Sequence, residues 1–196
     1  MNTIIATREE WLNQAKDGMI ETLFKQAGVE DTAQETKIRV TCAPTSYRAN
    51  SKILGWCFSD KNSGDGHHEL IISSKIDDGS RAMDVLAHEI THAVVGLEAG
   101  HGPKFRSLAI KIGLEGKMTA TVASEEFKKV ASKIMEKIGD YPHAEFNIGK
   151  KKQTTRMIKT ECQDCGAIAR LSRSTIENMN DVRCMDSECE GEIEIS

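Results

Sequence analysis

The string His88-Glu89-Ile90-Thr91-His92 constrains this chain more than any other part of its sequence. Two histidines four positions apart on a helix project from one face, with Cβ atoms about 5–6 Å apart, so both imidazoles can reach one metal ion. The surrounding residues are apolar nearly all round the helix, which indicates a buried helix. Buried histidine and glutamate need polar partners, and one metal ion satisfies them together. This argues against the alternative, a solvated helix with incidental histidines.

The same segment supplies candidates for the other roles of a catalytic site. Glu89 follows His88 directly, so its carboxylate lies beside the metal and can accept a proton from a metal-bound water. A catalytic zinc usually has three protein ligands and keeps a fourth position open for water. His101, nine residues after His92 and directly after Gly100, is the candidate for the third ligand. The pattern predicts a zinc hydrolase.

Composition and charge narrow the class of protein. The chain has 196 residues, 39% of them hydrophobic, which is enough for one medium domain or one domain with a small module. A formal net charge of −4 does not suggest a protein wrapped in nucleic acid, so nucleic-acid binding would depend on local basic patches. No apolar run of membrane-spanning length and no signal-peptide pattern is present, so we expect a soluble, cytoplasmic protein without a membrane partner. Nothing in the sequence indicates the oligomeric state.

Local patterns predict an α+β domain with a small sheet around the metal helix, over residues 1–146. Caps, Pro103 and apolar periodicity predict helices at residues 7–28, from about 80, at 103–113 and at 124–139. Short β-rich runs predict strands at residues 37–43, 53–58 and 69–73. The strand at 69–73 is either an exposed edge that pairs with an extended substrate or an ordinary strand covered by its neighbours.

Four cysteines near the C-terminus predict a second metal site. Cys162 and Cys165 form one close pair and, after eighteen residues, Cys184 and Cys189 form another. Four thiolates in two pairs suit a tetrahedral structural zinc, and the spacer suits a small β-ribbon over residues 159–196. A redox pair is the alternative, but no thioredoxin-like βαβ pattern surrounds it. Residues 167–172 and 192–195 are expected to be strands, and the zinc is expected to supply much of the stability of this module.

A basic segment separates the two expected domains. Residues 147–158 interrupt the apolar periodicity with the run 150–152 of lysines, and Arg156 and Lys159 continue the positive charge. The segment is either a solvated basic linker or a patch that contacts phosphates. Cys42 and Cys57 lie in strand-like apolar runs and are expected to be core thiols.

The strings HEITHAVVGLEAGHGPKF, GLEGKMTATV and YPH, with the C-terminal cysteines, resemble the SprT-like zinc metalloprotease family. Its eukaryotic relatives include Spartan, and the similarity is greatest to short bacterial and phage-type members; it covers residues 53–105 and the overall layout. The resemblance implies a zincin-like metalloprotease core with His88, His92 and His101 as zinc ligands and Glu89 as general base. It also implies a C-terminal zinc ribbon and a location in bacterial or phage-host cytoplasm.

The Spartan branch of that family degrades proteins crosslinked to DNA and is activated by DNA. The resemblance therefore implies a protein substrate and a DNA partner, either single-stranded or crosslinked to protein. One feature departs from the family pattern, and another argues against a nucleic-acid role of the ribbon. The spacing from Cys184 to Cys189 is wide, and the acidic tail of residues 188–194 argues against phosphate contact by the last strand.

These observations predict a zinc metalloendopeptidase that binds two zinc ions, one catalytic and one structural. Tyr141 and His143 either stabilise the oxyanion or serve the structure. Two further alternatives stay open: hydrolysis of another amide, and a non-catalytic, zinc-stabilised module that binds nucleic acid or a transcription complex. An open fourth position at the zinc would favour the enzyme, whereas a fourth protein ligand would favour the binding module. The candidates for that fourth ligand are His67, His68 and His143.

Overall fold

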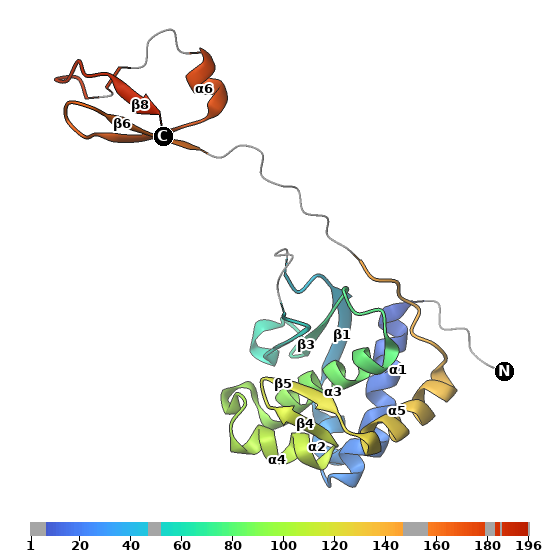
Figure 1. The fold of residues 1–196 in the computed structure, drawn as a ribbon. Helices are drawn as coiled ribbons and strands as arrows, with labels where there is room; N and C mark the ends of the chain where they lie inside the picture. Colours follow the sequence, from blue (N-terminus) through green and yellow to red (C-terminus); the bar gives the residue numbers. More distant parts are fainter. Residues whose placement is uncertain (1–6, 47–51, 147–156, 179–182, 185, 196) are drawn as a thin grey trace. The chain divides into compact units, whose positions relative to one another are not determined.

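The computed structural model describes residues 7–46, 52–146, 157–178, 183–184 and 186–195. The chain divides into two compact units, residues 1–148 and 149–196 (Figure 1). The expected basic linker, residues 147–158, lies outside the described residues except for Met157 and Ile158, and Ile158 already begins a strand. None of the described helices is both long and apolar enough to span a bilayer.

Five α-helices and three short helical turns are described in the N-terminal unit. They are α1 (Arg8–Met19) with a π-helical continuation η1 (Ile20–Phe24), α2 (Glu30–Glu35), η2 (Asp60–Asn62), α3 (Gly79–Val95), η3 (Leu97–Ala99), α4 (Pro103–Lys111) and α5 (Glu125–Ile138). The capping box of Thr7 and Glu10 is present at the start of α1, and Ser124 Oγ accepts a hydrogen bond from the amide of Phe127 at the start of α5. The expected helices are therefore present. Helix α2 was not predicted, because Ala33 is its one buried residue and its sequence therefore has no apolar period.

The main sheet has three strands, β1 (Ile38–Ala43), β2 (Gly55–Phe58) and β3 (His68–Ser73), in the order β1-β3-β2. β3 pairs in parallel with β1 and antiparallel with β2. The strand expected at 69–73 is therefore the central strand, and its possible role as an exposed edge is wrong. β2 is the edge strand beside it, and apolar alternation within each strand carries no information on which strand is central.

Helix α3 lies at the centre of the N-terminal unit, as Figure 1 shows. It packs against β2 and β3, against α1, α4 and α5, and against a second, two-stranded sheet. That sheet is a hairpin of β4 (Leu114–Lys117) and β5 (Ala120–Ala123). This hairpin was not predicted, because each strand has one buried residue, Leu114 in β4 and Thr121 in β5, and so no apolar alternation.

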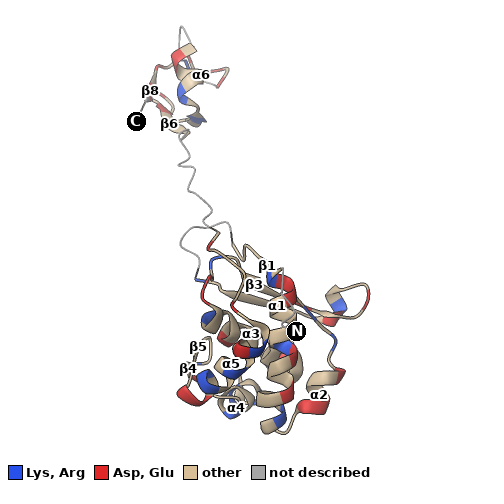
Figure 2. Cartoon of the chain, turned by 90° about the vertical axis from the view of Figure 1, so that its right-hand side faces the viewer, with Lys and Arg blue, Asp and Glu red and all other residues tan. Residues whose placement is uncertain are grey.

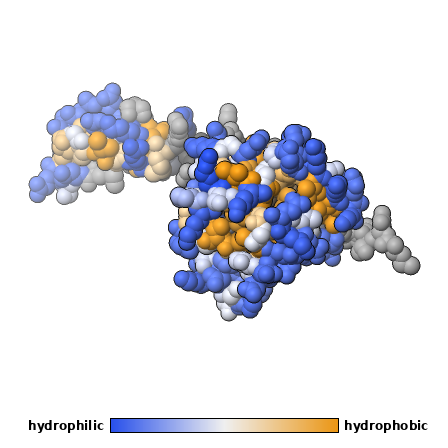
Figure 3. Space-filling model, turned by 90° about the horizontal axis from the view of Figure 1, so that it is seen from below, coloured by the Kyte–Doolittle hydropathy of each residue, from blue (hydrophilic) through white to orange (hydrophobic). Residues whose placement is uncertain are grey.

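Large buried side chains fill the space around α3, and charged ones cover the surface. Trp11, Phe24, Phe105 and Phe127 are almost fully buried, and Trp11 Nε1 donates to the carbonyl of Gly139 at 2.8 Å. Basic and acidic residues are interspersed along the helices and strands of this unit in the cartoon of Figure 2. On another face, hydrophobic residues reach the surface between hydrophilic ones (Figure 3).

The C-terminal unit is a small three-stranded antiparallel sheet with one short helix. Its elements are β6 (Ile158–Cys162), β7 (Ile168–Leu171), α6 (Arg173–Asn178) and β8 (Ile193–Ile195), with strand order β7-β6-β8. The strands expected at 167–172 and 192–195 are present as β7 and β8, whereas the central strand β6 was not predicted. The described residues of this unit that are buried are Thr160, Cys162 and Gly191. So small a core gives little hydrophobic stabilisation.

Candidate metal centres

Three histidines converge on one point of the N-terminal unit. His88 and His92 lie one turn apart on the same face of α3, which ends at Val95. The chain then reverses through η3 and Gly100, whose φ of 49° lies in the left-handed region that favours glycine. This reversal brings His101 Nε2 to 3.2 Å from His88 Nε2 and 3.1 Å from His92 Nε2. One nitrogen from each ring lies within 4.8 Å of the others, so the three residues could hold a metal ion.

Phe105 packs against all three imidazoles. Its ring centroid lies 4.8 Å from that of His88, 4.4 Å from that of His92 and 5.0 Å from that of His101. Phe105 is fully buried in the first turn of α4, which begins at Pro103. From the sequence, Phe105 was predicted only to be an apolar position of this helix. Its place two residues after Pro103, on the first turn that follows His101, is the signal that could have identified it.

Burial favours the neutral form of all three histidines. It lowers the pKa of His88 to about 3 and that of His92 to about 4, with smaller contributions from the neighbouring imidazoles. Burial also lowers the pKa of His101. Neutral imidazoles keep a nitrogen lone pair free, and a metal ion requires that form of its histidine ligands. The donor set and its protonation therefore fit a divalent metal such as zinc.

Glu89 lies beside the three histidines and does not join them. The residue is only 7% exposed, and its carboxylate makes no hydrogen bond to any described residue. Desolvation raises its pKa to about 8. A buried carboxylate without a partner is costly, and a proton-donating ligand such as water would relieve that cost. The position suits a group that exchanges protons with a bound molecule.

A cavity of about 550 Å³ opens over this cluster. Its walls include the three histidines and Glu89, residues 52–57 on and before β2, Arg81 and Val85 of α3, Leu97, and residues 119–121 of the β4–β5 hairpin. The histidines expected as alternative ligands lie elsewhere in the described structure. His143 Nε2 contacts the carbonyl of Ser74 at 2.9 Å, and His67 Nδ1 contacts Asp65 at 3.0 Å. Among the described residues, the cluster contains no fourth protein ligand.

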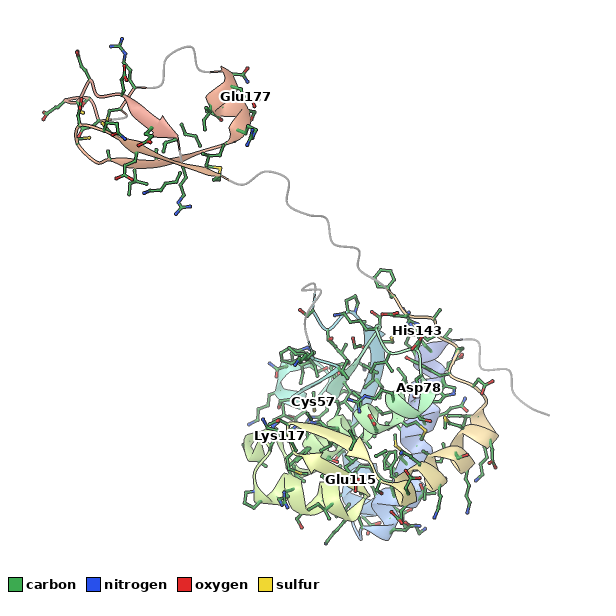
Figure 4. All side chains as sticks on the ribbon, in the orientation of Figure 1. Cys57, Asp78, Glu115, Lys117, His143 and Glu177 are labelled. Atoms are coloured by element: carbon green, nitrogen blue, oxygen red, sulfur yellow. The ribbon has the colours of Figure 1, made fainter. Side chains whose placement is uncertain are left out.

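Tyr141 and His143 do not line this cavity. The Tyr141 hydroxyl donates to Cys42 Sγ at 3.6 Å, and its ring packs against Trp11. Figure 4 shows His143 well separated from Cys57, a residue of the cavity wall. Of the two roles considered for Tyr141 and His143, the structure supports the structural one.

The four C-terminal cysteines also converge. Their sulfur atoms all lie within 4.8 Å of one another, with Cys162 3.7 Å from Cys189 and Cys165 3.5 Å from Cys184. The wide spacing from Cys184 to Cys189 is accommodated by a turn in which the Cys189 amide donates to the carbonyl of Asp186. Backbone amides of Cys165 and Asp164 point at Cys162 and lower its pKa to about 7, which favours the thiolate that zinc binds.

Cys42 and Cys57 take no part in the four-cysteine cluster. Cys42 is buried in β1, as expected of a core thiol. Cys57 is half-buried in β2 and lines the cavity over the histidines, and burial raises its pKa to about 12. The Cys57 thiol is therefore neutral at physiological pH.

Comparison of the chain with protein-family models, curated proteins and solved structures finds no match. The structure itself shows an α+β unit with a possible three-histidine metal site and a C-terminal unit with a possible four-cysteine metal site. The histidine set is compatible with a zincin-type HExxH…H site, and the cysteine set resembles a zinc ribbon.

Proposed function

We propose that the chain is a zinc-dependent metallopeptidase that hydrolyses peptide bonds at the histidine cluster. The observation that carries this proposal is the buried Glu89 carboxylate beside three converging imidazoles, with the cluster facing an open cavity. A purely structural zinc site is usually closed by a fourth protein ligand and has no use for a base.

The residues of the cluster have distinct roles in this proposal. His88, His92 and His101 would hold zinc, which acts as a Lewis acid on a water molecule and on the substrate carbonyl. Glu89 accepts a proton from the attacking water at its carboxylate and delivers it to the leaving nitrogen. The burial that raises the pKa of Glu89 also increases its basicity.

Among the described residues, no strand pairs with the edge of β2 that faces away from β3, and this edge supports a peptide as the substrate. The amide of Ser73 donates to the carbonyl of Leu54 at 2.9 Å, which fixes the hydrogen-bonding phase of the β2–β3 ladder. Polar groups of alternate residues point to opposite sides of a strand, so the backbones of Gly55 and Cys57 face the free edge. Both residues line the cavity. An extended peptide that paired with this edge would lie beside the histidine cluster.

We further propose that the substrates are DNA-associated or DNA-crosslinked proteins. This step depends on the resemblance to SprT-like proteases, and it is an analogy of site and layout. With a net charge of −4, DNA binding would be moderate and would weaken steeply as salt is raised.

A protease assay tests the proposed function. Purified, zinc-loaded protein is incubated with a DNA-binding protein substrate, with and without single-stranded DNA, beside the Glu89→Gln variant. Cleavage that disappears in a zinc-loaded Glu89→Gln protein is the expected result. Dependence of cleavage on DNA would support the DNA-associated substrate, and cleavage without DNA would leave the peptidase and remove the DNA switch.

The alternative from the sequence analysis is a zinc-stabilised binding module without peptidase activity. No cleavage under any condition, with zinc bound at the three histidines, would favour it. A zinc-loaded Glu89→Gln protein that still cleaves would instead contradict the role of Glu89.

A further inference from the structure

We propose that Thr121 is a positioning residue of the histidine site. Its hydroxyl would hold the His88 ring in the tautomer that carries the proton on Nδ1 and leaves Nε2 free for the metal. This inference depends on the zinc site of the proposed function, although it does not depend on peptidase activity.

The contact between the two side chains is short and buried. His88 Nδ1 lies 2.9 Å from Thr121 Oγ1, and Thr121 is only 5% exposed. On its other side, His88 Nε2 faces His101 Nε2 at 3.2 Å. A neutral imidazole has one N–H group, so a ring that offers the Nε2 lone pair to a metal must donate from Nδ1. The Thr121 hydroxyl is then the acceptor of that hydrogen bond.

His88 is the one ligand of the three with such support in the described part of the chain. Neither His92 nor His101 makes a hydrogen bond through Nδ1 to a described residue. Their ring contacts within the cluster are made by the Nε2 atoms. Histidine ligands of metals usually donate their second ring N–H to a protein acceptor or to water, and this bond fixes the tautomer and the orientation of the ring. At this site Thr121 supplies that acceptor from a separate sheet.

Helix α3 itself holds the β4–β5 hairpin in place to present Thr121. Arg81, seven residues before His88, donates through Nη1 to the Thr121 carbonyl at 3.4 Å and to Asp84 at 2.8 Å. The buried Asp84 in turn accepts a hydrogen bond from the backbone of Ala123. Arg81 and Asp84 of α3 thus bind the backbone of β5 at Thr121 and at Ala123. The hairpin is therefore part of the histidine site.

The test compares variants that differ only at the hydroxyl. Thr121→Val removes the hydroxyl and keeps the shape and strand preference of the side chain, whereas Thr121→Ser keeps the hydroxyl. Thr119→Val is the matched control, because Thr119 lies in the same hairpin, lines the same cavity and makes no hydrogen bond to a described residue. Each variant is made in the full chain.

Zinc affinity is the first measurement. Zinc retained per chain is followed against rising concentrations of a competing chelator, and a His88→Ala, His92→Ala double variant gives the curve of the cysteine site alone. Loss of an outer partner of a histidine ligand typically lowers metal affinity about ten- to a hundredfold. We expect that loss for Thr121→Val, and near wild-type affinity for Thr121→Ser and Thr119→Val. Equal affinity of wild type and Thr121→Val would overturn the inference.

The tautomer of His88 is the second measurement, and a purely structural role would not change it. Nitrogen–proton NMR correlations of zinc-loaded protein are expected to show a protected Nδ1–H on His88 in wild type and Thr121→Ser. In Thr121→Val that proton should exchange faster with water. An unchanged Nδ1–H in a folded Thr121→Val protein would also overturn the inference.

The readouts separate this inference from the proposed function. A protein that binds zinc, depends on Thr121 for its affinity and cleaves nothing would support the inference and contradict the peptidase. If the wild-type protein cleaves peptides and Thr121→Val binds zinc as tightly as wild type, the peptidase is supported and the inference is contradicted. Thermal unfolding of the zinc-free variants checks that they are folded. If Thr121→Val is unfolded, Thr121→Ala removes the same hydroxyl, and zinc affinity equal to that of wild type in Thr121→Ala would overturn the inference.

Discussion

Gly55 of β2 faces the carboxylate of Glu89 in α3 so closely that a Cβ at Gly55 would lie 2.8 Å from Glu89 Cδ. This approach brings the edge strand over the proposed general base. Glu89 is the flexible partner in the contact, because its carboxylate lies at the end of the side chain. An added methyl group would therefore displace the carboxylate before it displaced the strand.

The first prediction concerns Gly55→Ala. The variant is expected to fold and to bind zinc at the histidines, since the three atoms nearest to a Cβ at Gly55 all belong to the flexible side chain of Glu89. Peptidase activity should fall by at least about tenfold, because a displacement of about 1 Å at a catalytic group can cost a hundredfold in rate. Cleavage rate and zinc content are measured together. Gly64→Ala is the control, because no atom lies within 4 Å of a Cβ at Gly64. Full activity of Gly55→Ala would contradict the role of this contact.

The second prediction concerns Phe105, whose ring packs against the three imidazoles. Phe105→Ala should lower the free energy of unfolding by about 3–5 kcal/mol, as is typical when a buried phenylalanine is removed from a core. It should also weaken zinc binding at the histidines, because each ring loses a packing partner. Urea unfolding and chelator competition are the measurements. Phe146→Ala is the control, since the Phe146 side chain is 53% exposed and its loss should change stability little.

The spacing of His88 and His92 predicted the metal helix because it is a local feature of the sequence. Residues four apart on a helix share a face, whatever the helix packs against. The caps at Thr7 and Ser124 were predictable for the same reason. The order β1-β3-β2 depends on which strands meet in space, and no residue within β3 indicates it. Local pattern therefore identified the elements with a cap or an apolar period, missed α2, β4, β5 and β6, and left the neighbours of each strand undetermined.

The residues of the candidate site that were not predicted are those whose contacts join distant parts of the chain. Thr121 contacts His88 from thirty-three residues further along the chain, and its hydroxyl looks like that of any strand threonine in the sequence. Gly55 contacts Glu89 from an earlier part of the chain, and nothing in the sequence around Gly55 indicates this contact. Thr121 lies within the string GLEGKMTATV, but the string does not indicate its contact with His88, because the roles of Thr121 and Gly55 arise from tertiary packing.

The third prediction concerns the four-cysteine cluster. Cys189→Ser removes one sulfur, so zinc content should fall from two ions per chain to one, and residues 157–195 should lose their NMR dispersion. The small core of this unit cannot replace the metal. The N-terminal unit should keep its spectrum and its zinc, because its core is separate. Ser187→Ala is the control, because Ser187 is exposed and lies between Cys184 and Cys189 in the sequence. Two zinc ions in Cys189→Ser would contradict the assignment of Cys189 as a ligand.

The fourth prediction concerns pH and the loop between β2 and β3. Asp65 accepts hydrogen bonds from Ser63 and Arg39, each at 2.6 Å, and also contacts His67. These partners hold the pKa of the Asp65 carboxyl well below its usual range.

A native pKa below the unfolded value of about 3.9 means that ionised Asp65 stabilises the folded state above that pH. This contribution should be lost as pH falls below about 4. Asp65→Asn should therefore lower the free energy of unfolding at pH 7, and its difference from wild type should shrink at pH 3. Because Asp65 is exposed, salt should reduce the effect. Urea unfolding at both pH values measures it, with Asp77→Asn, at an exposed position, as the control. A difference between Asp65→Asn and wild type that persists unchanged at pH 3 would show that the charge of Asp65 is not the cause.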